Sequence, residues 1–383
     1  MIYALRMATL NQLLAPIEPE RFFADYHDRK PLHVPAGSDD GKRELLRWDA
    51  FNDLLNQTSV WTAQSLKLVL NTQAVAPESY CRIEATQSGP VLRPDPAKVA
   101  LHLAAGASAV AGDVQSLTPE LADTAQALGR TFAAAVGANV YCSFQGVRAF
   151  GTHYDLHHVF AVQTEGEKLW RLYSNRADRP VDFPPDTPET RRWLEQSRGA
   201  VSAEVLMKPG DVLYLPRGWY HDALAQDGAS LHVTFSVTPL YGRVIFNLLE
   251  QAAMQDPQFR DYLAPAHDDD GRTLQRQLAA LGGKLAQLAA SPAFRDEVAM
   301  TQNRLNPGRP RHALPSRTVL TAWRRTGLAG PQEIGPVAHA MAWAYAQPDF
   351  AVEELIAQFD FVAEQDIRAA VERAAAAGAL ARL

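Results

Sequence analysis

The chain has 383 residues, of which 47% are hydrophobic and 21% are charged, and its formal net charge is −6. This balance is typical of a globular protein with a core of ordinary size, and it excludes a strongly basic nucleic-acid-binding chain. Only two cysteines occur, Cys81 and Cys142, which excludes a disulfide framework or a cysteine-rich zinc site and favours a cytoplasmic location.

The N-terminal region predicts helices and neither a signal peptide nor a membrane span. It lacks a basic start followed by an apolar run and a small-residue cleavage site, and no stretch of the chain has about 18 apolar residues without charge. The segment EPERFFADYHDRKPLHV reads as a helix that stops before Pro31. The segment RWDAFNDLLNQ places Trp48, Phe51, Leu54 and Leu55 at helical spacing.

A strongly amphipathic helix is predicted over residues 118–137. Thr118 has the side chain of an N-cap, and Pro119 follows at the first helical position. Gly137 is the expected stop, because glycine adopts the left-handed conformation that ends many helices.

Residues 66–240 predict a body made mainly of short β-strands, with helix 118–137 packed outside it. The strand-like runs are NVYCSF, HHVFAVQ, KLWRLY, SAEVLMK, DVLYLP and LHVTFSVTP. Many short strands separated by Gly, Pro or charged turns are typical of a sandwich or a small barrel.

The chain becomes helical after Pro239. Helices are expected at 241–255 and 272–290, and the Pro- and Arg-rich stretch 303–316 is the clearest domain boundary. The last part predicts three short helices, of which the second and third are joined by a tight turn at Asp360. This order is the outline of a winged-helix module.

The segment GTHYDLHHVF and the segment PGDVLYLPRGWYH together predict a metal site. If His153 and Asp155 lie on one strand, their side chains point to the same face. His221, after a turn–strand–turn element, supplies a third ligand at the mouth of the same barrel. Two histidines and one carboxylate form the facial triad of non-haem Fe(II) oxygenases, which leaves coordination positions open for other ligands.

The remaining polar residues near this motif have competing interpretations. His157 is expected on the same face as Asp155, lining the pocket or its rim, whereas His158 faces the other way. Lys168 is either a surface residue of a hairpin or a buried cation that requires an anion, such as an organic acid that chelates the metal.

These motifs, with FFADYHDRKPLHVPAG and SLHVTFSV, resemble the JmjC-type Fe(II)- and 2-oxoglutarate-dependent oxygenases, and within them the ribosomal oxygenases that hydroxylate histidine or arginine side chains. The resemblance implies a double-stranded β-helix (jelly-roll or cupin) barrel in residues 1–240. A helical dimerisation region at 241–305 and a winged-helix-like domain at 306–383 would follow.

The resemblance also implies roles for individual residues. His153, Asp155 and His221 match the ligands of Fe(II). Lys168, Tyr141 and Thr234 match residues that hold the far carboxylate of 2-oxoglutarate, and Asn139 and Ser236 match positions near the substrate. The implied reaction hydroxylates an amino-acid side chain of a protein or peptide and releases succinate and CO₂. The substrate would be a ribosomal protein or a peptide precursor.

Two features depart from the family pattern. Bacterial arginyl-hydroxylating members have arginine where this chain has Lys168, so the chain is more similar to the histidyl branch there. The last predicted helix carries Glu364, Asp366 and Glu372 against Arg368 and Arg373, which favours a structural or protein-contact role over nucleic-acid binding.

Several alternatives remain open from the sequence. The enzyme could act on a ribosomally made peptide natural product, or it could remove an N-methyl group. A metal-binding cupin scaffold without catalysis and a transcriptional regulator are further alternatives. For assembly, Leu274, Leu278, Leu281, Leu285 and Leu288 follow a heptad-like spacing, which together with the resemblance predicts a homodimer through the two helices at 241–255 and 272–290.

Overall fold

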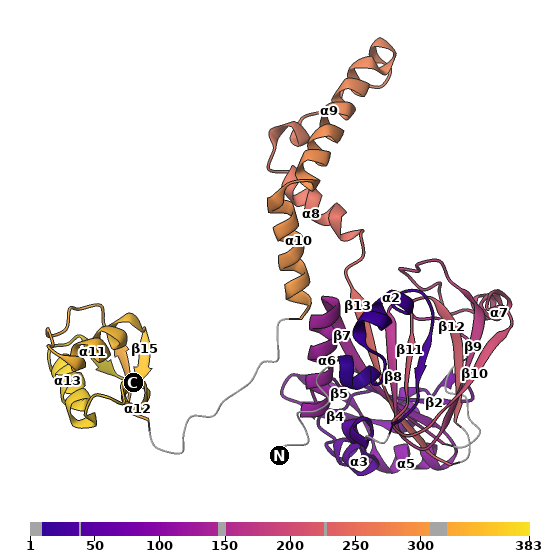
Figure 1. The fold of residues 1–383 in the computed structure, drawn as a ribbon, viewed down its shortest axis with the longest axis horizontal. Helices are drawn as coiled ribbons and strands as arrows, with labels where there is room; N and C mark the ends of the chain where they lie inside the picture. Colours follow the sequence, from indigo (N-terminus) through magenta and orange to yellow (C-terminus); the bar gives the residue numbers. More distant parts are fainter. Residues whose placement is uncertain (1–9, 38–39, 145–150, 226–227, 307–319) are drawn as a thin grey trace. The chain divides into compact units, whose positions relative to one another are not determined.

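The computed structural model describes residues 10–37, 40–144, 151–225, 228–306 and 320–383 (Figure 1). By its internal contacts the chain divides into two units, Met1–Arg309 and Pro310–Leu383. The division falls within the predicted connector 303–316, most of which lies outside the described residues. The finer division at residues 240 and 305 stays a prediction.

Two antiparallel sheets form the framework of the N-terminal unit. The larger has the strand order β1-β11-β8-β13-β7-β6-β2-β3 and the smaller has the order β10-β9-β12. The strands of the larger sheet are β1 (Leu32–Val34), β2 (Leu66–Leu70), β3 (Gln73–Ala74), β6 (Ser108–Ala111), β7 (Ala134–Ser143), β8 (His158–Glu165), β11 (Val212–Leu215) and β13 (Ser230–Pro239). Those of the smaller sheet are β9 (Lys168–Arg176), β10 (Val201–Met207) and β12 (Trp219–Ala225), and β4 (Cys81–Thr86) pairs separately with β5 (Gly89–Pro94).

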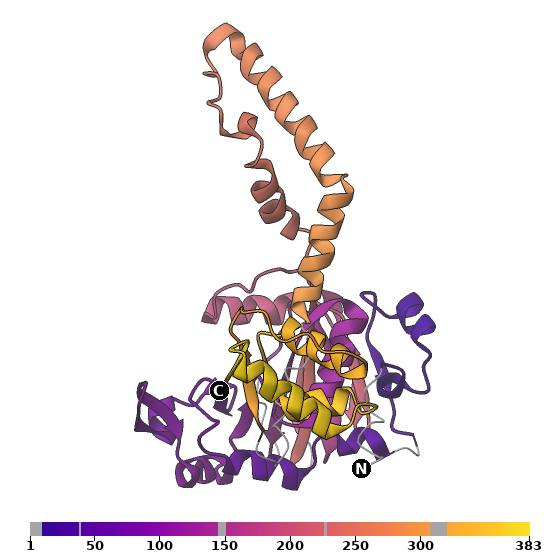
Figure 2. The same ribbon diagram turned by 90° about the vertical axis from the view of Figure 1, so that its left-hand side faces the viewer.

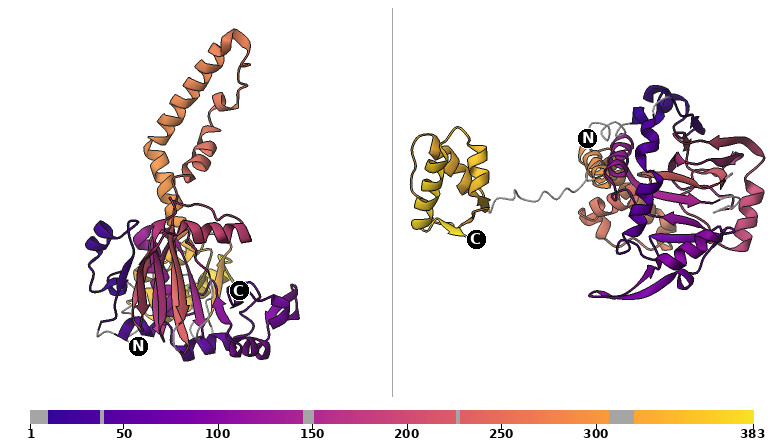
Figure 3. Two further views of the ribbon diagram at one scale, coloured as in Figure 1. Left: turned by 90° about the vertical axis from the view of Figure 1, so that its right-hand side faces the viewer. Right: turned by 90° about the horizontal axis from the view of Figure 1, so that it is seen from below.

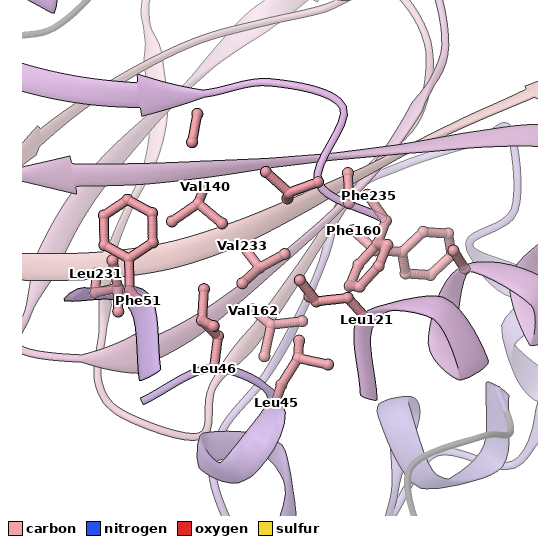
Figure 4. Packing of buried hydrophobic residues seen from close by; sticks show 14 of the residues in the cluster. Leu45, Leu46, Phe51, Leu121, Val140, Phe160, Val162, Leu231, Val233 and Phe235 are labelled. Atoms are coloured by element: carbon pink, nitrogen blue, oxygen red, sulfur yellow. The ribbon is translucent and has the colours of Figure 1, made fainter. Parts of the chain in front are cut away.

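Because side chains alternate along each strand, the two faces of the larger sheet carry different residues and pack against different elements. On one face, Val140, Phe160, Val162, Val233 and Phe235 are fully buried against helical segments (Figure 4). Burying one such side chain contributes about 1.5–3 kcal/mol. The neighbouring residues in these strands point to the opposite face, toward the smaller sheet. The predicted mainly β core is confirmed, and one of its faces remains available for a site.

In the described part of the chain, seven helical segments precede β7, and several of them pack on the outer face of the larger sheet. The seven are α1 (Leu10–Leu14), α2 (Pro19–Asp25), the 3₁₀ turn η2 (Asp40–Leu45), α3 (Trp48–Asn56), α4 (Pro77–Tyr80), α5 (Pro96–Ala104) and α6 (Pro119–Phe132). In α6 the predicted cap is present, because Thr118 accepts a hydrogen bond from the Leu121 N–H at 3.2 Å. Leu121 and Leu128 of α6 are buried in the core.

The predicted end of this helix at Gly137 is wrong. The helix stops at Phe132, Ala133 adopts the left-handed conformation with φ of 47°, and β7 begins at Ala134. Residues 134–143 pair with β13 over the whole length of the strand, which outweighs their local helical pattern. Gly137 lies opposite Ser236, where a Cβ atom would come within 3.0 Å of the Ser236 hydroxyl. The close approach of the two strands thus leaves little space for a larger residue at this position unless the Ser236 side chain shifts.

Two helical insertions extend the barrel. The stretch between β9 and β10 contains α7 (Pro188–Ser197). After β13 the chain forms an arm of α8 (Val244–Ala253), η3 (Pro257–Arg260), η4 (Asp268–Gly271), α9 (Arg272–Ala289) and α10 (Pro292–Leu305), in which α8 lies alongside the other two helices (Figure 2). The helices predicted at 241–255 and 272–290 are thus present. Neither α9 nor α10 has a buried residue.

The C-terminal unit contains the three predicted helices and a small sheet (Figure 3). The helices are α11 (Pro336–Ala346), α12 (Val352–Gln358) and α13 (Glu364–Ala376). The strands β14 (Ala322–Arg325), β15 (Asp349–Ala351) and β16 (Leu380–Arg382) pair in the order β15-β14-β16. Trp323, Phe350, Leu355 and Ile367 belong to its own core. Among all described helices of the chain, none has the length and apolarity required to cross a bilayer.

Candidate active site

The segment that carries His153 and Asp155 is irregular, so the expectation that both lie on a β-strand is wrong. Strand β8 begins only at His158. His153 instead forms an isolated bridge with His221 of β12, in which each backbone N–H donates to the other residue's carbonyl at 3.0 and 2.9 Å. The Gly218 N–H donates to the Asp155 carbonyl at 2.8 Å. Tertiary contacts with the β11–β12 region, not strand pleating, therefore bring the three side chains together.

His153, Asp155 and His221 form a cluster suited to a metal ion. One ligand atom from each lies within 4.8 Å of the others, and His221 Nε2 is 3.6 Å from Asp155 Oδ2. Ligand atoms bound at about 2.1 Å to one ion lie at most about 4.2 Å apart. Small side-chain rotations are therefore enough to bring all three onto one ion.

Backbone carbonyls orient the two imidazole rings. Nδ1 of His153 lies 2.9 Å from the Gly151 carbonyl, and Nδ1 of His221 lies 2.9 Å from the Trp219 carbonyl. A carbonyl partner requires a proton on Nδ1, so Nε2 of each ring is the nitrogen that would bind an ion. This arrangement is the usual support of a metal-binding histidine.

The electrostatic state of the cluster also suits a cation. Burial, followed by the neighbouring His153, lowers the pKa of His221 to about 4, so its ring is neutral at neutral pH. Burial alone would raise the pKa of Asp155, but the nearby histidines, His221 foremost, outweigh it and hold that pKa below its usual value. Neutral imidazoles and an ionised carboxylate are the forms that bind metals.

A cavity of about 90 Å³ between the two sheets opens at this cluster. Its volume corresponds to several water molecules. It is lined by Asn139, Tyr141, His153, Asp155, His157, Val159, Lys168, Trp170, His221, Ala223, His232 and Thr234. The predicted residues from five separate segments of the chain therefore meet around one space.

Lys168 is buried in this cavity, which rules out its interpretation as a surface residue of a hairpin. Its side chain is 3% exposed, and Nζ donates to the Ser143 hydroxyl at 3.2 Å. Among the described residues, no carboxylate lies within ion-pair distance of Nζ. Burial lowers the pKa of Lys168 to about 7. An anionic group entering the cavity would restore the charge of this amine.

Comparison with known proteins agrees with this geometry. Residues 114–243 match the family model described as JmjC domain, and this range contains the three clustered residues and Lys168. Residues 114–243 of the chain therefore form a JmjC domain. The chain is similar to the NO66 protein of Dictyostelium discoideum, named a bifunctional lysine-specific demethylase and histidyl-hydroxylase. The two are 28% identical over 311 residues, which cover 76% of this chain and 58% of that protein.

Other relatives support the predicted resemblance to ribosomal oxygenases. Human ribosomal oxygenase 1 is 31% identical over 189 residues, which cover 44% of this chain and 29% of that protein. The chain thus spans less than two thirds of the length of either relative. The crystal structure of ycfD from E. coli shares the fold with a TM-score of 0.50 at 14% identity, over 96% of this chain and 98% of that one. The predicted JmjC cupin-type core is thereby confirmed.

The other predicted residues are distributed around the JmjC cavity. Asn139, Tyr141, Thr234 and His157 line it, whereas Ser236 is not among the lining residues and donates to the Gly137 carbonyl at 3.3 Å. The lining of the cavity therefore does not support the prediction that Ser236 lies near the substrate. As expected, His158 faces the other way, where its Nδ1 lies 3.1 Å from the Tyr214 hydroxyl.

His232 and Trp170 line the JmjC cavity but were not predicted. His232 is 3% exposed and stacks on Tyr141 with ring centroids 4.8 Å apart, and its Nδ1 has no hydrogen-bond partner among the described residues. Burial, followed by Lys168, lowers its pKa well below the usual value. Strand alternation could have identified it, because His232 lies two residues before Thr234 on the same face of β13.

Proposed function

We propose that the protein is an Fe(II)- and 2-oxoglutarate-dependent oxygenase that hydroxylates an amino-acid side chain of a protein or peptide. The observation that carries the proposal is the cluster of two histidines and one aspartate at a cavity that contains a buried lysine without a carboxylate partner among the described residues. When bound, iron would supply the reaction with O₂, in which one oxygen atom enters succinate as 2-oxoglutarate loses CO₂ and the other is inserted into a C–H bond of the substrate.

The residues of the chain have separate tasks in this proposal. His153, Asp155 and His221 would be the residues that hold the metal. The Lys168 amine holds the far carboxylate of 2-oxoglutarate through an ion pair, and Tyr141 and Thr234 offer hydroxyl groups beside it. The buried setting excludes water, which strengthens that ion pair. The chain thus orients the cosubstrate, and the metal and cosubstrate perform the oxidation.

A second hollow beside the cavity supports a substrate larger than a metabolite. Its volume is about 570 Å³, and it shares Asn139 and Tyr141 with the first cavity. Its lining also includes Val69 and Val110 of β2 and β6 and the polar residues Lys67 and Asp113. An extended chain whose reacting side chain enters the cavity could rest its flanking residues there. This shape supports a protein or peptide substrate. Relatives named ribosomal oxygenase 1 and histidyl-hydroxylase support the same substrate class.

The remaining parts have proposed roles of their own. The leucines of α9, none of which is fully buried, support dimerisation through the helical arm, and the helices of the C-terminal unit support a winged-helix-like module for protein contacts. The two buried, unpaired cysteines support a reducing compartment such as the cytoplasm.

Anaerobic titration of the purified protein with Fe(II) and 2-oxoglutarate, followed by exposure to O₂ and detection of succinate, tests the proposed chemistry. His153→Ala, Asp155→Ala and His221→Ala should each abolish metal-dependent succinate formation, because each removes one of three ligands. His157→Ala is the matched control and should retain metal, since His157 lines the same cavity but does not belong to the cluster of three ligands. Near-wild-type succinate formation by any of the three ligand variants would contradict that ligand's assignment.

Incubation of the protein with a peptide library, followed by measurement of which peptides gain the mass of one oxygen atom, tests the substrate class. Succinate formation that no peptide or protein stimulates, and no oxygen gain in any peptide, would contradict the proposed hydroxylase. Loss of a methyl group would instead indicate demethylation.

A further inference from the structure

A buried polar cluster lies on the opposite side of the backbone from the proposed metal ligands. Asp222 directly follows His221, and Thr152 directly precedes His153. Because side chains alternate along β12, Asp222 points away from the cavity, and the Thr152 hydroxyl lies 3.3 Å from its Oδ2. Asp222 is 1% exposed, and Thr152 and Tyr173 of β9 are also buried. A carboxylate at this depth requires compensation from polar partners.

Arg198, at the end of α7, completes the cluster. Its Nη1 donates to the Thr152 hydroxyl at 2.8 Å and to the Tyr173 hydroxyl at 2.5 Å. Both hydroxyls in turn donate to Oδ2 of Asp222, Thr152 at 3.3 Å and Tyr173 through a short hydrogen bond. Arg198 Nη1 is 3.9 Å from the same Oδ2. Arginine, two hydroxyls and aspartate therefore form a closed ring of hydrogen bonds.

The ring reinforces the contact between two segments that each carry a proposed metal ligand. The segment with His153 and Asp155 precedes β8, and backbone hydrogen bonds connect it to His221 and Gly218. The side chains of residues 152 and 222 meet beside the bridge between His153 and His221. A shift of either segment along the other would break the ring. The ring therefore opposes relative movement of the two histidines.

We propose that Asp222, with Thr152, Tyr173 and Arg198, is a positioning clamp that fixes the separation of His153 and His221 from outside the barrel. The inference rests on the proposed metal site. None of these four residues is among those that line the cavity. Through Arg198, the clamp also connects the insertion that contains α7 to the metal site.

Binding of Co(II) to the metal-free protein tests the clamp without any substrate. Calorimetry gives the affinity, and the visible absorption of bound Co(II) reports its coordination geometry. Removal of outer partners of metal ligands typically reduces metal affinity by about 10–100-fold. We expect a loss in this range for Asp222→Asn and Arg198→Met, together with a changed Co(II) absorption band. Tyr173→Phe should have a smaller effect, because the Thr152 hydroxyl still links Arg198 to Asp222. Arg198→Lys keeps the charge and should recover part of the loss.

Arg191→Met is the matched control, since Arg191 lies in the same insertion and pairs with Asp186 on the surface. It should bind Co(II) like the wild type. Wild-type affinity and absorption in folded Asp222→Asn and Arg198→Met would overturn the clamp. If Asp222→Asn does not fold, the Arg198→Met and Tyr173→Phe variants decide the question by the same measurements. Arg198 is partly exposed, so its substitution disturbs the core less. Failure of the wild type to bind Co(II) would instead overturn the proposed metal site itself.

Discussion

Lys168 shows how burial changes the chemistry of a single residue. In the cavity its amine has one hydrogen bond to Ser143, and its pKa lies near 7 because of burial. A carboxylate placed against it would form an ion pair shielded from water. Removing one member of a buried ion pair typically costs roughly 3–5 kcal/mol. Cosubstrate affinity should therefore depend strongly on this one side chain.

Lys168→Ala is expected to weaken 2-oxoglutarate binding more than a hundredfold, following from that cost. Co(II) binding should stay nearly intact, because Lys168 is not among the clustered ligands. Calorimetric titration of 2-oxoglutarate into the Co(II)-loaded protein measures the first quantity, and titration of Co(II) measures the second. Lys208→Ala, at an exposed lysine after β10, is the control. Unchanged affinity in Lys168→Ala would contradict the assignment.

The same residue predicts a pH dependence of binding. Without an anion, Lys168 has a pKa of about 7, and a bound carboxylate raises that pKa. Above pH 7, binding must therefore take up a proton, so 2-oxoglutarate affinity should fall by up to about tenfold per pH unit as pH rises. Below pH 7 affinity should be nearly constant. His221, with its pKa near 4, does not titrate in this range. Calorimetry in buffers of different ionisation enthalpy measures the proton uptake. An affinity for 2-oxoglutarate that does not change between about pH 7 and 8.5 would refute the predicted pH dependence.

At the scale of elements, two similarly capped helices differ in what they bury. Thr118 caps α6 and Thr187 caps α7, each accepting a backbone N–H at 3.2 Å. Helix α6 packs on the larger sheet through several buried side chains, whereas α7 has no buried residue. The same local contact therefore has different consequences, because only α6 is integrated into the core.

Thr118→Ala is expected to lower the free energy of unfolding of the N-terminal unit by about 1 kcal/mol, the usual cost of losing such a cap. Thr187→Ala should lower it less, because α7 can fray without exposing core residues. Urea denaturation of both variants, followed by circular dichroism, measures the difference. An equal or larger loss in Thr187→Ala would show that α7 stabilises the unit more than its burial indicates.

At the scale of the whole molecule, the helical arm carries apolar residues that one chain does not cover. Helix α9 has no buried residue, Leu278 is 51% exposed, and Leu281 lines an open hollow of the arm. Exposed apolar surface of this kind typically marks an interface. A second copy of the chain, related by a two-fold axis, would cover it.

Leu281→Glu and Leu285→Glu are expected to convert the proposed dimer to monomers, because each places a charge in an apolar interface. Light scattering or sedimentation at micromolar concentration measures the mass, and Co(II) binding should persist because the arm does not contribute ligands. Gln287→Glu adds the same charge at an exposed position of α9 and should leave the dimer intact. A monomeric wild-type protein under these conditions would contradict the proposal.

The sequence alone determined the features that depend on local pattern or on motif chemistry. The cap at Thr118, the helical spacing in the arm and the strand-rich body follow from periodicity and residue type, and the structure contains all three. His153, Asp155 and His221 could be selected because few residue types bind metals. Their spacing in the sequence also matched a known motif.

Tertiary structure decided the features that depend on pairing between distant segments. Pairing with β13 moved the end of α6 from Gly137 to Phe132, and the bridge to His221 placed His153 outside any regular strand. The burial of Lys168 depends on two sheets that close around it. The ring around Asp222 joins residues up to 70 positions apart. Local periodicity carries no information about such contacts, because they exist only once the chain has folded.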